Sequence, residues 1–150
     1  MNYIGFNKYD TANGPGIRVS LFVSGCTVHC KGCFNPESWD FNAGYKLTDE
    51  IKDEIIKELK QPWIEGFSLL GGDPFEPQFT DCLCDLLARI KNEVGKSVWC
   101  WTGRKYEKIK RNPLLQYIDV LVDGPFIEHL KCKDEWRGST NQRIIELKSN

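Results

Sequence analysis

The chain has 150 residues, of which 41% are hydrophobic, and its 20 Lys and Arg against 21 Asp and Glu give a formal net charge of −1 at pH 7. This length fits one compact domain over residues 1–150, and near neutrality predicts neither a nucleic-acid-binding surface nor a surface for anionic membranes. No apolar run approaches the roughly 20 residues that span a bilayer, so we expect a soluble cytoplasmic protein.

The N-terminal part of the chain predicts two strands joined by a turn. Residues 1–10 mix aromatic and polar side chains and predict a first strand, and the β-branched run at 17–24 predicts a second. Between them, Asn13-Gly14-Pro15-Gly16 is typical of a turn, with Arg18 as a charge at the edge of the strand that follows.

Three cysteines follow the second strand within eight residues: Cys26, Cys30 and Cys33. Thiolates hold iron–sulfur clusters, and three of them leave one iron of a four-iron cube without a protein ligand. Catalytic metal sites keep such an open position for the reacting molecule. The spacing therefore predicts a catalytic cluster bound by these three cysteines.

The seven cysteines allow two other interpretations. A disulfide framework suits short secreted chains, but residues 1–10 carry no signal-peptide pattern, and cytosolic thiols stay reduced. A zinc site stays open as an alternative if a fourth ligand joins the three cysteines. The candidates for that ligand are His29, Cys82, Cys84, Cys100 and Cys132.

The middle of the chain predicts a helix and then a strand with a glycine turn. Thr48 is an N-cap candidate, and apolar residues at helical spacing continue to about Lys60, before Pro62. Residues 66–70 predict a buried strand that leads into Gly71-Gly72-Asp73-Pro74. Adjacent glycines let a ligand approach the main chain, although a plain turn has the same pattern.

The C-terminal half predicts further strands and helices. A helix is expected over 78–94, a strand over 97–101 that ends in Thr102-Gly103-Arg104, a short basic helix over 105–111, and strands at 117–122 and 144–147. Trp99 and Trp101 should share one face of their strand and Cys100 the other. Cys82 and Cys84, two apart on a helix, should not face each other.

The alternation of strands and helices predicts an α/β fold with a parallel sheet of about four to six strands. The chain is too short for a closed eight-unit barrel, so we expect a partial, open (β/α) barrel. The cysteine loop and the turns at 71–73, 102–104 and 123–125 each follow a strand. Because ligands bind at the carboxyl ends of parallel strands, these segments should converge on one site.

The cysteine spacing resembles that of the radical S-adenosylmethionine (SAM) superfamily, and Asn-Gly-Pro-Gly-x-Arg ahead of it is typical of the glycyl-radical activating enzymes in that superfamily. The resemblance implies a partial barrel and a [4Fe–4S] cluster on Cys26, Cys30 and Cys33, with the open iron holding SAM. It differs at Gly32, where an aromatic residue is usual, at Asp73, where Glu is commoner, and at Trp101, where relatives tend to carry an acid. The SAM contacts that it implies are Gly32, Cys33 and Phe34 for adenine, Gly71, Gly72 and Asp73 for the amino group, and Thr102 for the carboxylate.

The resemblance also implies a reaction. A radical SAM oxidoreductase of this kind cleaves SAM reductively and abstracts hydrogen from a glycine of a partner enzyme, with no catalytic residue beyond the cluster and SAM. The implied partners are the glycine-bearing loop of the large anaerobic ribonucleotide reductase subunit and a low-potential electron donor such as flavodoxin. An activase of another glycyl-radical enzyme and a non-enzymatic zinc or iron–sulfur binding protein stay open as alternatives.

Overall fold

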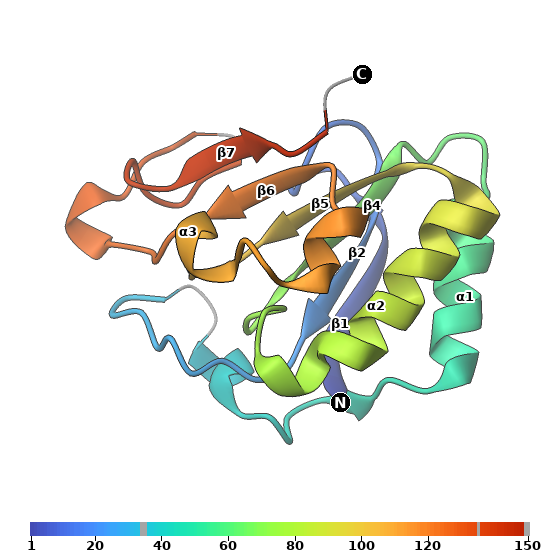
Figure 1. The fold of residues 1–150 in the computed structure, drawn as a ribbon, viewed down its shortest axis with the longest axis horizontal. Helices are drawn as coiled ribbons and strands as arrows, with labels where there is room; N and C mark the ends of the chain where they lie inside the picture. Colours follow the sequence, from blue (N-terminus) through green and yellow to red (C-terminus); the bar gives the residue numbers. More distant parts are fainter. Residues whose placement is uncertain (34–35, 135, 149–150) are drawn as a thin grey trace.

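The computed structural model describes residues 1–33, 36–134 and 136–148, which form an α/β fold with a seven-stranded mixed sheet (Figure 1). The strands are β1 (Asn2–Asp10), β2 (Arg18–Val23), β3 (Tyr45–Lys46), β4 (Gly66–Gly71), β5 (Ser97–Trp101), β6 (Val120–Asp123) and β7 (Arg143–Glu146). The α-helices are α1 (Asp49–Leu59), α2 (Thr80–Arg89) and α3 (Tyr106–Ile109). Shorter helical turns are η1 (Pro36–Trp39), η2 (Pro77–Phe79), η3 (Ile90–Val94), η4 (Pro113–Tyr117) and η5 (Glu128–Leu130).

The strand order is β3-β1-β2-β4-β5-β6-β7. The pairs β2/β4, β4/β5 and β5/β6 are parallel, whereas β1 and β3 at one side and β7 at the other pair antiparallel. The α/β class and the parallel strands are therefore confirmed. The sheet has one strand more than the upper number expected, because the two residues of β3 pair with β1. It is mixed rather than parallel throughout, because β1, β3 and β7 pair antiparallel.

The two faces of the sheet have different roles. Alternate residues of β2 and β4, such as Leu21 and Leu69, are fully buried in a core with Ile55 of α1 and Leu86 of α2. Figure 1 shows α1 and α2 on the same side of the sheet. The opposite face carries Phe22, Leu70 and Trp101, which line a pocket. The period of two in the strands thus separates the core from the site.

The helix expected after Thr48 forms as α1, with the predicted cap. The Thr48 hydroxyl oxygen accepts a hydrogen bond of 3.3 Å from the Ile51 N–H. We expect Thr48→Ala to lower the free energy of unfolding by about 1 kcal/mol, because an N–H of the first turn loses its partner. Urea denaturation of the apoprotein measures this, with Thr48→Ser as the control that keeps the hydroxyl. An equal loss in both variants would show that the cap does not contribute.

Arg18 is fully buried, so its prediction as a strand-edge charge is wrong. Its guanidinium donates to the Ser68 hydroxyl at 2.8 Å, to the Phe67 carbonyl at 3.1 Å and to Ser97. Burial lowers the pKa of Arg18 to about 10. The turn before β2 packs Gly14 against this side chain. Arg18 therefore joins the first residues of three parallel strands.

The strand predicted at 117–122 starts later, as β6 at Val120. The Asn112 side chain accepts from the Leu114 N–H at 2.9 Å, and Pro113 follows it, so residues up to Tyr117 form the turn η4 instead. Pro at the first position of a helical turn and an Asn cap favour this local structure over an extended one. The other predicted elements form within a few residues of their expected bounds. Within the described ranges, no helix has the length and apolar character needed to cross a membrane.

Candidate functional site

A pocket of about 640 Å³ lies where the parallel strands end. Its lining includes residues from three of the four segments expected to converge: Cys26, Cys30 and Cys33 from the cysteine loop, Gly71, Gly72 and Asp73 after β4, and Thr102 and Gly103 after β5. No residue of the fourth segment, 123–125, is among the lining residues. Phe126, directly after it, lines the pocket, while the Asp123 carboxylate accepts hydrogen bonds from the Tyr106 N–H and from Arg143. The structure thus brings three of the four predicted segments together in one pocket.

The cysteine loop is held against residues 38–39 by its main chain. The Gly25 N–H donates to the Ser38 carbonyl at 2.7 Å and the Cys26 N–H to the Trp39 carbonyl at 3.3 Å. The His29 ring stacks on the Trp39 ring with centroids 4.4 Å apart. These contacts fix the path of the loop at Gly25, Cys26 and His29.

The three thiols of the loop fit an iron–sulfur cluster in their chemistry. None of them forms a disulfide, Cys26 is buried, and Cys30 and Cys33 are half-buried. Burial raises the pKa of Cys26 and of Cys30, so a bound metal would be needed to hold them as thiolates. In the described part of the chain, no three His, Cys, Asp or Glu side chains are placed to share one metal ion. A four-iron cube needs no such convergence, because each thiolate binds a different iron.

The other four cysteines divide into two groups. Cys82 and Cys84 lie on α2 and Cys100 is fully buried in the core, all of them outside the pocket lining. Cys132, which the sequence offered only as a candidate fourth ligand of a zinc site, lines the pocket, and its thiol lies 3.8 Å from the Arg137 carbonyl oxygen. Nothing in its spacing indicates this position, because the segment returns to the pocket only through the tertiary fold.

The two adjacent glycines are required by a close approach of two main chains. The Gly72 N–H donates to the Val23 carbonyl and the Asp73 N–H to the Gly25 carbonyl, at 2.7 and 2.8 Å. A Cβ at Gly72 would lie 2.6 Å from the Gly25 carbonyl carbon, and Gly71 has a φ of +115°. The turn therefore packs directly on the cysteine loop. A larger residue at Gly72 would displace that loop, so it is not a selective test of SAM binding.

The carboxylate of Asp73 is fully buried and is used within the protein. It accepts hydrogen bonds from the Thr102 hydroxyl at 2.8 Å, the Phe75 N–H at 2.9 Å and the Gly103 N–H at 2.9 Å. Burial raises its pKa, and these donors and Arg104 act against that effect. Because the side chains of Asp73 and Thr102 satisfy each other, these residues would offer a ligand their main chain.

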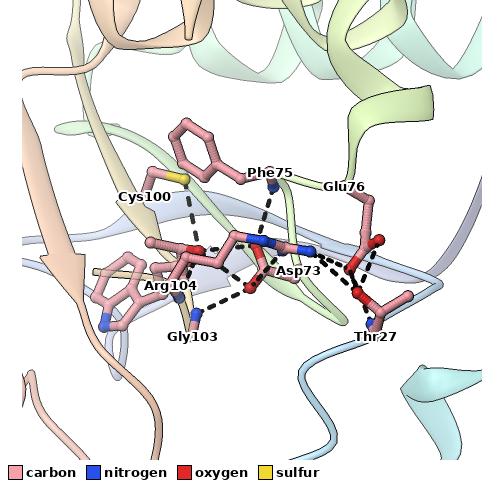
Figure 2. A network of polar contacts seen from close by, with 9 residues as sticks. Thr27, Asp73, Phe75, Glu76, Cys100, Gly103 and Arg104 are labelled. Atoms are coloured by element: carbon pink, nitrogen blue, oxygen red, sulfur yellow. Dashed lines mark hydrogen bonds and ion pairs between the residues drawn. The ribbon is translucent and has the colours of Figure 1, made fainter. Parts of the chain in front are cut away.

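Arg104 connects this turn to the cysteine loop (Figure 2). Its guanidinium lies 3.2 Å from an Asp73 oxygen and 2.8 Å from a Glu76 oxygen, and it donates to the Thr27 hydroxyl at 3.1 Å. Glu76, which is 2% exposed, also accepts from the Thr27 N–H at 2.8 Å. Nothing in the local sequence around Arg104 or Glu76 predicts that these two side chains pair. Their pairing depends on how the ends of β4 and β5 meet.

The Glu76 network predicts a dependence of stability on pH. Burial acts to raise the pKa of Glu76, but hydrogen bonds from Arg104 and Thr27 outweigh it and hold the pKa below its ordinary value. A lowered pKa in the folded state stabilises the protein above the unfolded-state pKa of about 4.3, and this contribution is lost as the pH falls through the folded-state value. We expect the stability difference between the parent and Glu76→Gln to shrink between about pH 5 and pH 3.

Urea denaturation of both apoproteins across this range measures the difference. Other carboxylates with lowered pKa, such as Asp10 and Asp123, titrate equally in both proteins and cancel. A difference that stays constant down to pH 3 would contradict the expected role of Glu76.

Aromatic side chains form much of the remaining pocket lining. Trp101 and Trp136 line it, and the Trp101 ring N–H donates to the Trp136 carbonyl at 2.8 Å. The Trp99 and Trp101 rings share a face as predicted, with centroids 5.8 Å apart. Trp39 and Phe126 also line the pocket, whereas Phe75 is buried in the core.

One of the predicted adenine contacts, Gly32, lies outside the pocket lining. Gly32 has a φ of +77°, next to the Glu128 side chain, and is not part of the pocket lining. Phe34 lies outside the described residues. Of Gly32 and Cys33, the two that the structure describes, only Cys33 lines the pocket.

Comparison with known proteins gives concordant results. Residues 12–145 match the family described as "4Fe-4S single cluster domain". The chain is similar to the anaerobic ribonucleoside-triphosphate reductase-activating protein of Vibrio cholerae, with 45% identity over 96% of this chain and 97% of that protein. The protein of the same name from Haemophilus influenzae is 44% identical over 99% of this chain and 99% of that protein. The one from Enterobacteria phage T4 is 41% identical over 96% of this chain and 93% of that protein.

Proposed function

The chain belongs to the family of anaerobic ribonucleoside-triphosphate reductase-activating proteins, and from this premise we propose how its pocket serves that activation. The protein is an activating enzyme of anaerobic ribonucleotide reductase with a 4Fe–4S cluster domain. The branch of the radical SAM superfamily predicted from the motifs is thus confirmed.

We assign Cys26, Cys30 and Cys33 as the cluster ligands and the rest of the pocket to SAM. The observation that carries this assignment is the pocket itself, which is lined by these three cysteines together with Gly71, Gly72, Asp73 and Thr102. When bound, the cluster and SAM supply the reductive cleavage and the hydrogen abstraction, and we assign no further catalytic residue.

The protein's own residues position these groups. The Gly71-Gly72-Asp73 turn is fixed on the cysteine loop by main-chain hydrogen bonds, and Arg104 ties both to the end of β5. We propose that the main chain at Gly72, Asp73 and Thr102, which line the pocket, contacts SAM. Gly32 and Phe34 stay in the proposal as adenine contacts, through the chain that flanks Cys33.

The proposal also covers the domain, the electron donor, the location in the cell and the partner loop. Residues 1–150 would form a single radical SAM domain, in which the sheet is a partial, open barrel whose inner face carries Phe22, Leu70 and Trp101. A low-potential donor such as flavodoxin would reduce the cluster, and the protein would act in the cytoplasm. The glycine-bearing loop of the large reductase subunit would enter the pocket beside Trp39 and Phe126.

Electron paramagnetic resonance tests the function directly. The reconstituted, reduced protein with SAM and the anaerobic reductase should give a glycyl-radical doublet and 5'-deoxyadenosine. A reductase variant that lacks its radical glycine is the control and should give no doublet. No doublet with the intact reductase would contradict the proposal, and a site that takes up zinc in place of iron and sulfide would favour the non-enzymatic alternative.

A further inference from the structure

The segment 104–111 carries a concentration of positive charge in a chain that is nearly neutral overall. Five of these eight residues are Lys or Arg, and one is acidic. That acid, Glu107, is engaged by Arg143 at 2.8 Å. The side chains of Lys105, Lys108, Lys110 and Arg111 are exposed. In the part of the chain that the structure describes, no carboxylate forms an ion pair with any of these four.

These charges border a second pocket, separate from the first. The basic pocket has a volume of about 470 Å³, and its lining includes Phe75, Pro77, Arg104, Lys105, Lys108 and Arg111. It shares no lining residue with the cysteine pocket. Asp73 and Thr102 line the cysteine pocket, whereas Phe75 and Arg104, two residues further along each turn, line the basic pocket. The two turns therefore separate the two pockets. A protein bound over α3 would therefore leave the cysteine pocket open.

The basic pocket is nevertheless close to the proposed cluster ligands. Arg104 lines it and also donates to the hydroxyl of Thr27, the residue after Cys26, at 3.1 Å. One hydrogen bond thus joins the basic pocket to the cysteine loop.

From these observations we propose that the basic pocket, with Lys105, Lys108, Lys110 and Arg111, is the docking surface for an acidic face of the protein that reduces the cluster. This inference rests on the proposed function, which needs both an electron and a glycine loop. The glycine loop must enter the cysteine pocket, so the electron donor needs a different approach. Unpaired lysines steer an acidic partner and make its association depend on ionic strength.

The docked donor would transfer one electron to the cluster. The donor is oxidised by one electron and the [4Fe–4S] cluster is reduced by one, and no covalent bond forms or breaks. The lysines act on the encounter of the two proteins rather than on the cluster, so they should change the rate of reduction by a protein donor and leave reduction by a small neutral molecule unchanged.

The test is the double substitution Lys105→Glu and Lys108→Glu in the reconstituted protein. The matched control is Lys57→Glu with Lys60→Glu, which has the same spacing and charge change on exposed residues at the end of α1, well apart from α3 in Figure 1. Reduced flavodoxin serves as the acidic donor and photoreduced 5-deazariboflavin as the small neutral one. Anaerobic stopped-flow absorbance of the cluster gives the second-order rate constant over a range of salt concentrations.

We expect the substitutions at Lys105 and Lys108 to lower the rate constant with flavodoxin at low salt by about tenfold or more and to flatten its salt dependence. The control should stay within about twofold, and reduction by deazariboflavin should be equal in all three proteins. Equal flavodoxin rates in the two double variants would overturn the proposal. So would an unchanged flavodoxin rate with weakened binding of the reductase, which would assign the surface to that partner.

The two proposals fail in distinguishable ways. If deazariboflavin reduces the parent cluster but no 5'-deoxyadenosine forms from SAM, the proposed function is wrong. If 5'-deoxyadenosine forms but the substitutions at Lys105 and Lys108 do not change the rate of cluster reduction by flavodoxin, only the proposed docking surface is wrong.

Discussion

Replacement of Cys26, Cys30 or Cys33 by alanine should remove the cluster, with iron and sulfide falling from about four of each per chain to near zero. Each thiolate occupies one iron, and a loop with two remaining thiolates cannot complete the site. The three thiols lie in one pocket and have no disulfide partner. Iron and sulfide analysis after anaerobic reconstitution measures the effect, and the absorbance of the cluster gives an independent readout.

The remaining cysteines provide matched controls. Cys82→Ala and Cys84→Ala on α2 should retain a full cluster, and Cys100→Ala should retain it at some cost in stability, because Cys100 is fully buried in the core. Cys132→Ala is the most demanding control, since this thiol lines the same pocket. Full iron content in Cys30→Ala together with loss in Cys132→Ala would show that the ligands are assigned wrongly.

Replacement of Asp73 by alanine should lower the free energy of unfolding by about 3–5 kcal/mol. The carboxylate is fully buried, and its loss leaves the partly buried Arg104 without one counter-ion and the Gly103 and Phe75 N–H groups without their acceptor. Urea denaturation of the apoprotein measures the loss. Because Arg104 also holds Thr27, the cysteine loop should loosen and take up less iron.

Two further variants separate charge from hydrogen bonding at Asp73. Asp73→Asn keeps one acceptor oxygen and should lose less than Asp73→Ala. In a double-mutant cycle with Arg104→Met, the Asp73→Ala substitution should cost less than in the parent, because no unpaired guanidinium remains. Fully additive effects, or a loss under 1 kcal/mol in Asp73→Ala, would show that the buried pair does not support the turn.

The sequence by itself determined much of the local structure and predicted three cysteine ligands for a cluster. The spacing of Cys26, Cys30 and Cys33 predicted the donor set, and the Thr48 cap and the helical and strand periodicities predicted α1, α2, β4 and β5 near their observed bounds. These features depend on residues a few positions apart, so they can be recognised in a single chain. The order of strand and turn also predicted that the motifs meet at one edge of the sheet.

Only the tertiary structure decided what each side chain does once the motifs meet. Asp73 and Thr102, predicted to contact SAM, bond to each other through their side chains, and Gly72 is needed because its main chain touches Gly25. Arg104 and Glu76 form an ion pair that their local sequence does not indicate, and Cys132 lines the pocket. The physical reason is that burial and pairing arise between segments distant in the chain, and a fully buried carboxylate must accept donors from whichever strands end beside it.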